Sequence, residues 1–274
     1  MIICIDLDRT LIYSANALDL PATEKPRLRC VEIYRDAPLS YMTETAAGLL
    51  RDLRTHAAVV PTTTRTPEQL ARVRLPGGPS GYAIASNGGH LMVDGEPDRA
   101  WTAQVTARLA GCAPLTEVEA HLQMTAGPFV LALRVASDLF CYAVVDRAAL
   151  PAGWVDALAA WCAPRGWAVS LQGRKVYAVP RPLTKSAAAS EVRHRLGGGP
   201  LLAAGDSLLD ADLLDVADAA IRPAHGELAE AGFTRDHLTV TGTTGVRAGE
   251  EMLAWMHARV RTGRTSPSWR CGTS

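Results

Sequence analysis

Three short apolar runs in this sequence each end in acidic or hydroxyl-bearing residues. The run IICI is followed by Asp6 and Asp8, the run AAVV leads to Thr63, and the run LLAAG leads to Asp206 and Asp210. Short apolar runs rich in β-branched residues and bounded by turn-prone residues are typical of buried strands in a parallel sheet. Ligands of open α/β sheets bind outside the carboxyl ends of the strands. We therefore expect these five side chains to converge on one site.

The pattern along the chain predicts two domains. Helical periodicity between the apolar runs predicts an α/β fold with a Rossmann-like parallel-sheet core. From about residue 90 to 178 the pattern becomes helix, two strands, helix, two strands, with helices expected over residues 103–123 and 150–162. Strands so close in sequence pair antiparallel, which predicts an inserted α+β cap domain, an antiparallel sheet with two helices. The predicted domains are a discontinuous core of residues 1–89 and 179–262, a cap of residues 90–178 and a polar tail of residues 263–274.

The residue types at the expected site favour phosphoryl transfer. Four carboxylates in one crevice repel one another unless a cation or a proton lies among them, and an all-oxygen site suits Mg²⁺. The DxDxT spacing places Asp6 and Asp8 on one side of an extended strand end, where one can attack phosphorus and the other can donate a proton to the leaving group. Thr63 and Lys185 can supply the hydrogen-bond donors and positive charge that a transferring phosphoryl group needs.

The segments DLDRT, TTR at residues 63–65, Lys185 and GDSLLD resemble, in this order, the four motifs of the haloacid dehalogenase (HAD) superfamily. The match covers nearly all of the predicted core. The NGG at residues 87–89, followed by the α+β insertion, resembles the branch with a type IIB (C2) cap, which includes Cof-like sugar phosphatases, sucrose-phosphate phosphatase and mannosyl-3-phosphoglycerate phosphatase. The resemblance implies a magnesium-dependent phosphatase that hydrolyses a small phosphorylated metabolite (a sugar phosphate, a phosphoglycerate-type or a nucleotide-like compound) through an aspartyl-phosphate.

Carried over to this sequence, the resemblance implies a role for each catalytic residue. Asp6 is the nucleophile, and Asp8 is first the general acid and then the general base. Thr63 holds the phosphoryl oxygens, and Lys185 neutralises the charge that develops on them.

The resemblance also implies the magnesium ligands. Asp6 and Asp206 bind Mg²⁺ directly, the backbone carbonyl of Asp8 reaches it, and Asp210 binds it through water or orients the catalytic lysine. Many relatives carry Asn just before the last acidic residue of the fourth motif, where this chain has Leu209. A donor to the phosphate or a metal contact is therefore missing from the pattern.

Further residues are candidates for binding the substrate. Thr64 replaces the glycine that is common in the second motif. Arg65 either binds the substrate phosphate or pairs with a neighbouring acid. Polar residues in the cap either face the crevice or lie on a solvated surface. The predicted substrate-binding residues are Thr64, Arg65, Asn87, Arg134 and Arg174, with Gln172 and Lys175 as neighbouring cap candidates.

Composition restricts the partners of the chain. Lys plus Arg equals Asp plus Glu at 28 each, so no overall field favours nucleic acid, and the small phosphorylated substrate is the expected partner. No window is apolar for long enough to span a membrane, and the start of the chain lacks the features of a signal peptide, so we expect a cytoplasmic monomer or homodimer. The seven scattered histidines lack the spacing of a zinc site.

Two other functions remain open at this stage. A non-catalytic HAD module could use the cap to bind a ligand or a partner, and Leu209 favours that alternative. A phosphotransferase could pass the phosphoryl group to an acceptor other than water. The clustered carboxylates argue against the first alternative, because a retired active site has no physical need for them.

Overall fold

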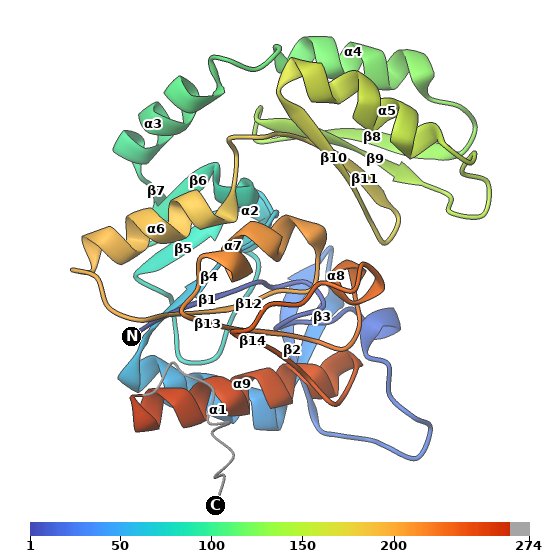
Figure 1. The fold of residues 1–274 in the computed structure, drawn as a ribbon. Coiled ribbons are helices and arrows are strands. Elements are labelled where there is room, and N and C mark those ends of the chain that lie inside the picture. Colours follow the sequence, from blue (N-terminus) through green and yellow to red (C-terminus); the bar gives the residue numbers. More distant parts are fainter. Residues whose placement is uncertain (264–274) are drawn as a thin grey trace, which may run out of the picture.

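A five-stranded parallel sheet forms the centre of the protein, in the strand order β14-β13-β12-β1-β4 (Figure 1). The computed structural model describes residues 1–263, so the predicted tail of residues 263–274 lies outside the described residues except at Gly263. Strand β1 pairs in parallel with β12 on one side and with β4 on the other, which brings the carboxyl ends of all three to one edge. The strands are β1 (Ile2–Ile5), β4 (Ala58–Pro61), β12 (Leu201–Ala204), β13 (Ala219–Arg222) and β14 (Leu238–Val240).

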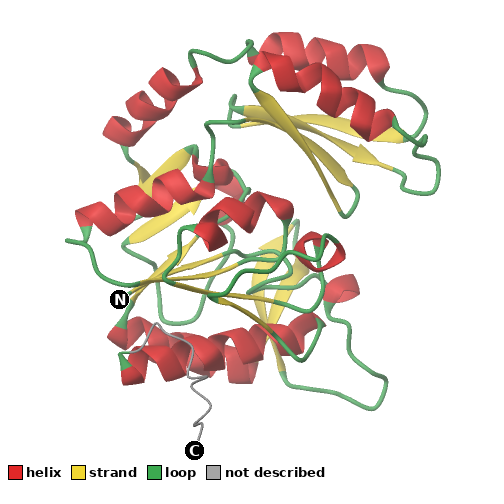
Figure 2. Ribbon diagram, viewed as in Figure 1, coloured by secondary structure: helices red, strands yellow, loops and turns green. Residues whose placement is uncertain are grey.

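Helices cover both faces of this sheet (Figure 2). Side chains alternate along a strand, so Ile3 and Ile5 pack into one apolar cluster while Ile2 and Cys4 pack into another. The first cluster includes residues of α1 (Glu44–His56) and α9 (Gly245–Thr262), and the second includes residues of α6 (Lys185–Arg195), α7 (Ala211–Asp215) and α8 (Glu227–Glu230). The core is therefore a three-layer α/β sandwich, as the alternating pattern predicted.

A hairpin and a short helix border the site edge of the core. The strand expected over residues 30–34 lies within β2 (Leu28–Tyr34), which pairs antiparallel with β3 (Ala37–Thr43). Helix α2 (Pro67–Leu70) begins at a capping box in which Thr66 and Gln69 each accept a hydrogen bond from the other's backbone N–H. The hairpin carries a buried acid, Glu32, towards α2.

The segment after α2 packs on the core before the chain enters the cap. Strand β5 (Tyr82–Ala85) forms an antiparallel sheet with β6 (His90–Val93) and β7 (Glu96–Pro97), and α3 (Arg99–Leu109) follows. Trp101 on α3 donates a hydrogen bond to the carbonyl of Gly88 at 2.8 Å. The prediction of a single helix over residues 103–123 is wrong, because the helix is interrupted at residues 110–114, where Pro114 precedes α4 (Leu115–Thr125). We propose that the cap starts after α3 rather than at residue 90.

The cap is a four-stranded antiparallel sheet in the order β10-β11-β9-β8, with α4 and α5 (Trp154–Cys162) on the face turned away from the core (Figure 1). Its strands are β8 (Val130–Ala136), β9 (Phe140–Val145), β10 (Trp167–Gln172) and β11 (Lys175–Pro180). The predicted class, a Rossmann-like core with an inserted α+β cap of one antiparallel sheet and two helices, is confirmed. Within residues 1–263, no helix combines the length and the apolar character needed to cross a bilayer.

Candidate active site

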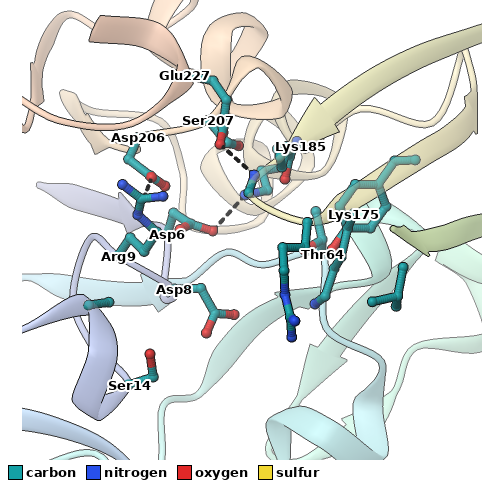
Figure 3. Close-up of a pocket in the computed structure, with 16 residues that line it drawn as sticks. Asp6, Asp8, Arg9, Ser14, Thr64, Lys175, Lys185, Asp206, Ser207 and Glu227 are labelled. Atoms are coloured by element: carbon teal, nitrogen blue, oxygen red, sulfur yellow. Dashed lines mark hydrogen bonds and ion pairs between the residues drawn. The ribbon is translucent and has the colours of Figure 1, made fainter. Parts of the chain in front are cut away.

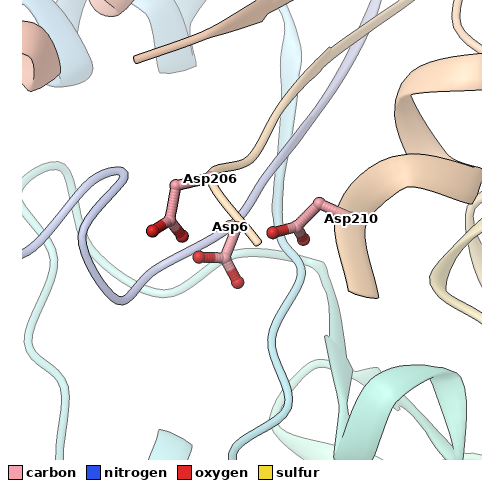
Figure 4. Close-up of side chains that lie close together, drawn as sticks. All are labelled: Asp6, Asp206 and Asp210. Atoms are coloured by element: carbon pink, nitrogen blue, oxygen red, sulfur yellow. The ribbon is translucent and has the colours of Figure 1, made fainter. Parts of the chain in front are cut away.

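Three buried aspartates meet at the carboxyl edge of the central sheet (Figure 4). Asp6 follows β1, while Asp206 and Asp210 follow β12, and one carboxylate oxygen of each lies within 4.8 Å of the others. The backbone N–H of Asp6 donates to the carbonyl of Ala204 at 2.9 Å, which extends the pairing of β1 with β12 up to the site. Parallel pairing of two strands distant in sequence thus creates the carboxylate cluster.

Lys185 is the buried counter-charge of this cluster. It is the first residue of α6, whose N-terminus is capped by the side chain of Thr184. Its Nζ lies 2.7 Å from Oδ1 of Asp6 and 2.5 Å from Oδ1 of Asp210, and the side chain is 0% exposed. Burial alone lowers the pKa of this lysine, but the charges of Asp210 and Asp6 outweigh burial and raise it, so the ammonium is kept charged.

Asp210 is fixed by partners on both oxygens. Its Oδ2 accepts hydrogen bonds from the backbone N–H and the hydroxyl of Ser207, at 2.9 and 2.8 Å, while Oδ1 faces Lys185. Gly205 permits this approach, because a Cβ there would lie 2.3 Å from Cβ of Asp210. With both oxygens occupied, Asp210 is better placed to orient Lys185 than to bind a metal directly.

Asp206 has open coordination sites by comparison. Its contacts are long, 3.5 Å to the hydroxyl of Thr10 and 3.6 Å to Nε of Arg9. Burial raises the pKa of Asp6 to about 7, and it raises the pKa of Asp206 well above its usual range, with the charge of Asp6 adding to the effect. The three carboxylates face a single ammonium, so the cluster carries more negative charge than Lys185 offsets. An all-oxygen donor set with excess negative charge fits Mg²⁺.

The predicted general acid, Asp8, is held in an ion pair in this structure. Nε and Nη2 of Arg65 each lie 2.7 Å from one Asp8 oxygen. Arg65 is held in turn by buried Glu32, with 2.9 Å between Nη1 and Oε2. Desolvation raises the pKa of Asp8, but the hydrogen bonds and charge of Arg65 outweigh it and lower that pKa. Of the two alternatives for Arg65, the structure places it against the neighbouring acids.

A cavity of about 350 Å³ opens between this edge of the core and the cap (Figure 3). Asp6, Asp8, Lys185 and Asp206 line it from the core. Thr64 lines it as well, whereas Thr63 is buried beside it, with Oγ1 accepting a hydrogen bond from the backbone N–H of Arg65 at 3.2 Å. The geometry therefore makes the Thr64 hydroxyl a second candidate for the phosphoryl oxygens.

The structure places only some of the predicted substrate-binding residues at the cavity. Arg174, on the turn between β10 and β11, lines the cavity. Arg134 on β8 is exposed and is not among the lining residues, although it lies opposite Tyr142 in the cap sheet. Asn87 is buried at a positive φ of 56° and donates from its side chain to the carbonyl of Leu183 at 2.8 Å. Its position suits tying the turn before β6 to the segment between β11 and α6 rather than touching substrate.

Several lining residues were not among the predicted site residues, although Arg9 and Ser207 lie within DLDRT and GDSLLD. Arg9 and Ser14 come from the loop after β1, and Ser207 comes from the loop after β12. Glu227, at the start of α8, accepts a hydrogen bond from the backbone N–H of Gly173 in the cap at 3.2 Å. Glu227 therefore links core and cap across the cavity, a role that depends on tertiary contact alone.

Comparison with solved structures places this fold. No protein-family model matches the chain, and no curated protein matches it. The sucrose-phosphatase of Synechocystis sp., solved with sucrose and phosphate, superposes with a TM-score of 0.61 at 16% identity over 94% of this chain and 97% of that one. A Thermoplasma acidophilum protein gives a TM-score of 0.62 at 13% identity over 95% and 97%. A HAD subclass IIB sugar phosphatase gives 0.57 at 11% over 94% and 99%.

The chain has the fold of the HAD subclass IIB phosphatases. The resemblance inferred from the four motifs is confirmed at the level of the fold. On the HAD fold, DLDRT follows β1, TTR follows β4, Lys185 begins α6 and GDSLLD follows β12. The first, third and fourth segments contribute the acidic cluster and its lysine.

Proposed function

We propose that this protein is a magnesium-dependent phosphatase acting on a small phosphorylated metabolite. The observation that carries the proposal is the buried cluster of Asp6, Asp206 and Asp210 around Lys185, at the carboxyl edge of a fold shared with sugar phosphatases. Burying three carboxylates around one lysine is costly for a purely structural purpose, because each ion loses its hydration. A site that binds a divalent cation and a phosphate recovers that cost.

Asp6, Asp8, Lys185 and Asp206 each have a part in the proposed reaction, and Asp210 orients Lys185. A carboxylate oxygen of Asp6 attacks phosphorus, a bond from that oxygen to phosphorus forms, and the bond to the leaving oxygen breaks while Asp8 gives it a proton. Asp8 then takes a proton from water, whose oxygen bonds to phosphorus as the bond to Asp6 breaks. Lys185 stabilises negative charge throughout. Asp6, Asp206 and the Asp8 carbonyl would hold Mg²⁺, whose positive charge would offset the negative charge of the phosphoryl oxygens.

The Asp8 side chain must break its ion pair with Arg65 before it can protonate the leaving group. The arginine holds Asp8 ionised and its carboxylate is 54% exposed, so the side chain can turn towards a bound substrate. Arg65 would then be free to face the leaving group while Glu32 keeps its position. The ion pair is therefore part of the resting arrangement in the proposed cycle.

A small substrate fits the closed geometry. The cavity lies between core and cap, and the Glu227 contact to Gly173 closes one side of it. The structural neighbours include a sucrose-phosphatase and a sugar phosphatase, which supports a phosphorylated sugar or a related metabolite as the substrate class. The cap shields the reaction from bulk water.

Leu209 does not argue for a non-catalytic module. Its side chain packs against the apolar cluster that includes residues of α6 and α7, and Leu209 is not among the residues that line the cavity. Ser207, two residues earlier, lines the cavity, and its hydroxyl donates to Asp210 at 2.8 Å. The departure from the motif therefore leaves the aspartates and Lys185 of the site in place.

The test is magnesium-dependent release of inorganic phosphate from a panel of sugar phosphates, phosphoglycerates and nucleotides. Asp6→Asn should lower turnover at least about 10³-fold because it removes the nucleophile. Asp156→Asn, an exposed site on α5, is the matched control. Equal turnover by wild type and Asp6→Asn on every substrate would favour the binding-module alternative, whereas product alcohol formed without matching free phosphate would favour a phosphotransferase.

A further inference from the structure

A second hollow opens directly beside the catalytic cavity. It measures about 180 Å³, and we call it the arginine lobe because Arg65 and Arg72 line it. Gln69 from α2 and Tyr142 from the cap complete its walls. The arginine lobe and the catalytic cavity share four lining residues, which are Asp8, Thr64, Lys175 and Tyr177. A single ligand can therefore occupy both spaces.

The acid inside the arginine lobe is already satisfied. Oε2 of Glu32 accepts a hydrogen bond from Ser40 at 2.6 Å and lies 2.9 Å from Nη1 of Arg65. Its Oε1 accepts from Nε of Arg72 at 3.3 Å, and the side chain is 0% exposed. Glu32 thus holds the two arginines in place without presenting negative charge to a ligand.

Besides Asp8 and the hydroxyls of Thr64 and Tyr177, the remaining polar groups of the lobe are donors. Arg72 uses only Nε for Glu32, and its two Nη groups make no hydrogen bond within the described part of the chain. Gln69 uses its Oε1 for the cap of α2, which leaves its amide N–H groups. Nζ of Lys175 forms no ion pair among residues 1–263 and lies 5.5 Å from the ring centre of Tyr142. Such a set recognises an acceptor that carries negative charge.

The reaction geometry directs the leaving group towards this lobe. A general acid must lie within hydrogen-bond reach of the oxygen that departs. Asp8 has that role in the proposed function, and Asp8 lines both spaces. With phosphorus at Asp6, the leaving oxygen lies beside Asp8, and the atoms beyond it reach the arginine lobe.

We propose that the arginine lobe binds an anionic group, a carboxylate or a second phosphate, on the leaving group of the substrate. The inference rests on the proposed phosphatase function and narrows its substrate class to phosphomonoesters with an acidic leaving group. A space of 180 Å³ equals about six water molecules at ~30 Å³ each, enough for a small acidic fragment. Arg72, Gln69 and Lys175 are the residues that would determine this specificity.

The test compares substrates that differ only in the acidic group. Glycerol 3-phosphate, whose leaving group is uncharged, is the reference. In 3-phosphoglycerate a carboxylate replaces the primary alcohol of that leaving group, and in glycerol 1,3-bisphosphate the same alcohol carries a second phosphate. Wild type should show kcat/KM at least about tenfold higher for one of the acids, since a hydrogen bond to a charged group is worth that much. The acid that is preferred distinguishes the two sources of charge.

A variant in the lobe and a matched control outside it separate an effect on specificity from an effect on structure. Arg72→Gln should reduce the preference for the acid about tenfold, mainly through KM. Arg74→Gln makes the same change of charge two residues away, at an exposed arginine outside the lobe, and should keep the preference. Lys175→Gln, at an exposed position, is the second variant if Arg72→Gln does not fold.

The possible outcomes test the anion site in the arginine lobe separately from the proposed phosphatase function. Preference for glycerol 3-phosphate in wild type, or equal loss in Arg72→Gln and Arg74→Gln, would overturn it while leaving phosphatase activity established. If no substrate is turned over faster than by Asp6→Asn, the proposed function fails. Calorimetric titration of the Asp6→Asn protein then tests the arginine lobe alone. Tighter binding of an acidic compound than of glycerol 3-phosphate, if it is lost when Arg72→Gln is added, supports the proposed anion site. Equal binding of the acidic compounds and glycerol 3-phosphate overturns it.

Discussion

Removing the buried lysine tests the electrostatic reasoning most directly. Lys185→Met keeps the length of the side chain but leaves Asp6 and Asp210 without their cation at 2.7 and 2.5 Å. Removing one partner of a buried ion pair costs about 3–5 kcal/mol. At about 2–4 °C per kcal/mol for a chain of this size, the melting temperature in EDTA should fall by roughly 6–20 °C.

Magnesium should restore part of the lost stability, because a divalent cation can replace the missing positive charge among the carboxylates. The measurement is thermal unfolding of wild type and Lys185→Met, each with EDTA and with saturating Mg²⁺. Lys25→Met, at an exposed position, controls for loss of a lysine. A melting temperature for Lys185→Met within about 2 °C of Lys25→Met in EDTA would refute the reasoning, since the carboxylates would then not depend on Lys185.

Two more predictions follow from the same site. Burial raises the pKa of Asp6 to about 7, so between about pH 4 and pH 7 the metal-free folded protein binds more protons than the unfolded chain, and its stability falls as pH rises. Thermal unfolding in EDTA should show this fall in melting temperature, and Mg²⁺ should raise the melting temperature more at pH 8 than at pH 5. An equal effect of Mg²⁺ at both pH values would contradict the prediction. Gly226→Ala should lower kcat/KM about 10²-fold, because φ is +91° and the new Cβ would lie 2.6 Å from the backbone oxygen of Asp206. Gly232→Ala, also at positive φ but in open space, should lose stability and keep activity.

The local patterns predicted the strands of the active-site edge and of the cap sheet. Apolar runs of four or five residues became β1, β4 and β12, and the alternation of residues 129–145 and 167–179 became the cap sheet. The helix expected over residues 103–123 failed because Pro114 outweighs the apolar periodicity on either side of it. The domain boundaries stay a prediction, and two contacts support the later start of the cap proposed above: β6 pairs with β5, and Trp101 on α3 donates to the carbonyl of Gly88.

The candidate site was partly predictable for a similar reason. The acidic cluster follows from strand ends that a parallel sheet must bring to one edge, so Asp6, Asp206 and Asp210 could be grouped in advance. Nothing local in the sequence indicates that Glu32 is buried or that it holds Arg65 against Asp8. Those contacts join residues far apart along the chain, and only packing of the hairpin against α2 creates them.

The sequence by itself determined the elements, the order of the strand-end residues and the chemistry those residues can perform, since these depend on periodicity and on side-chain type. Tertiary structure decided which carboxylate and hydroxyl oxygens of these residues already have hydrogen-bond partners and which face the cavity. Asp210 is bound on both sides while Asp206 is open, and Thr64 rather than Thr63 faces the cavity. The physical reason is that burial, charge balance and hydrogen-bond satisfaction belong to the assembled environment of a group, which no local stretch of sequence contains.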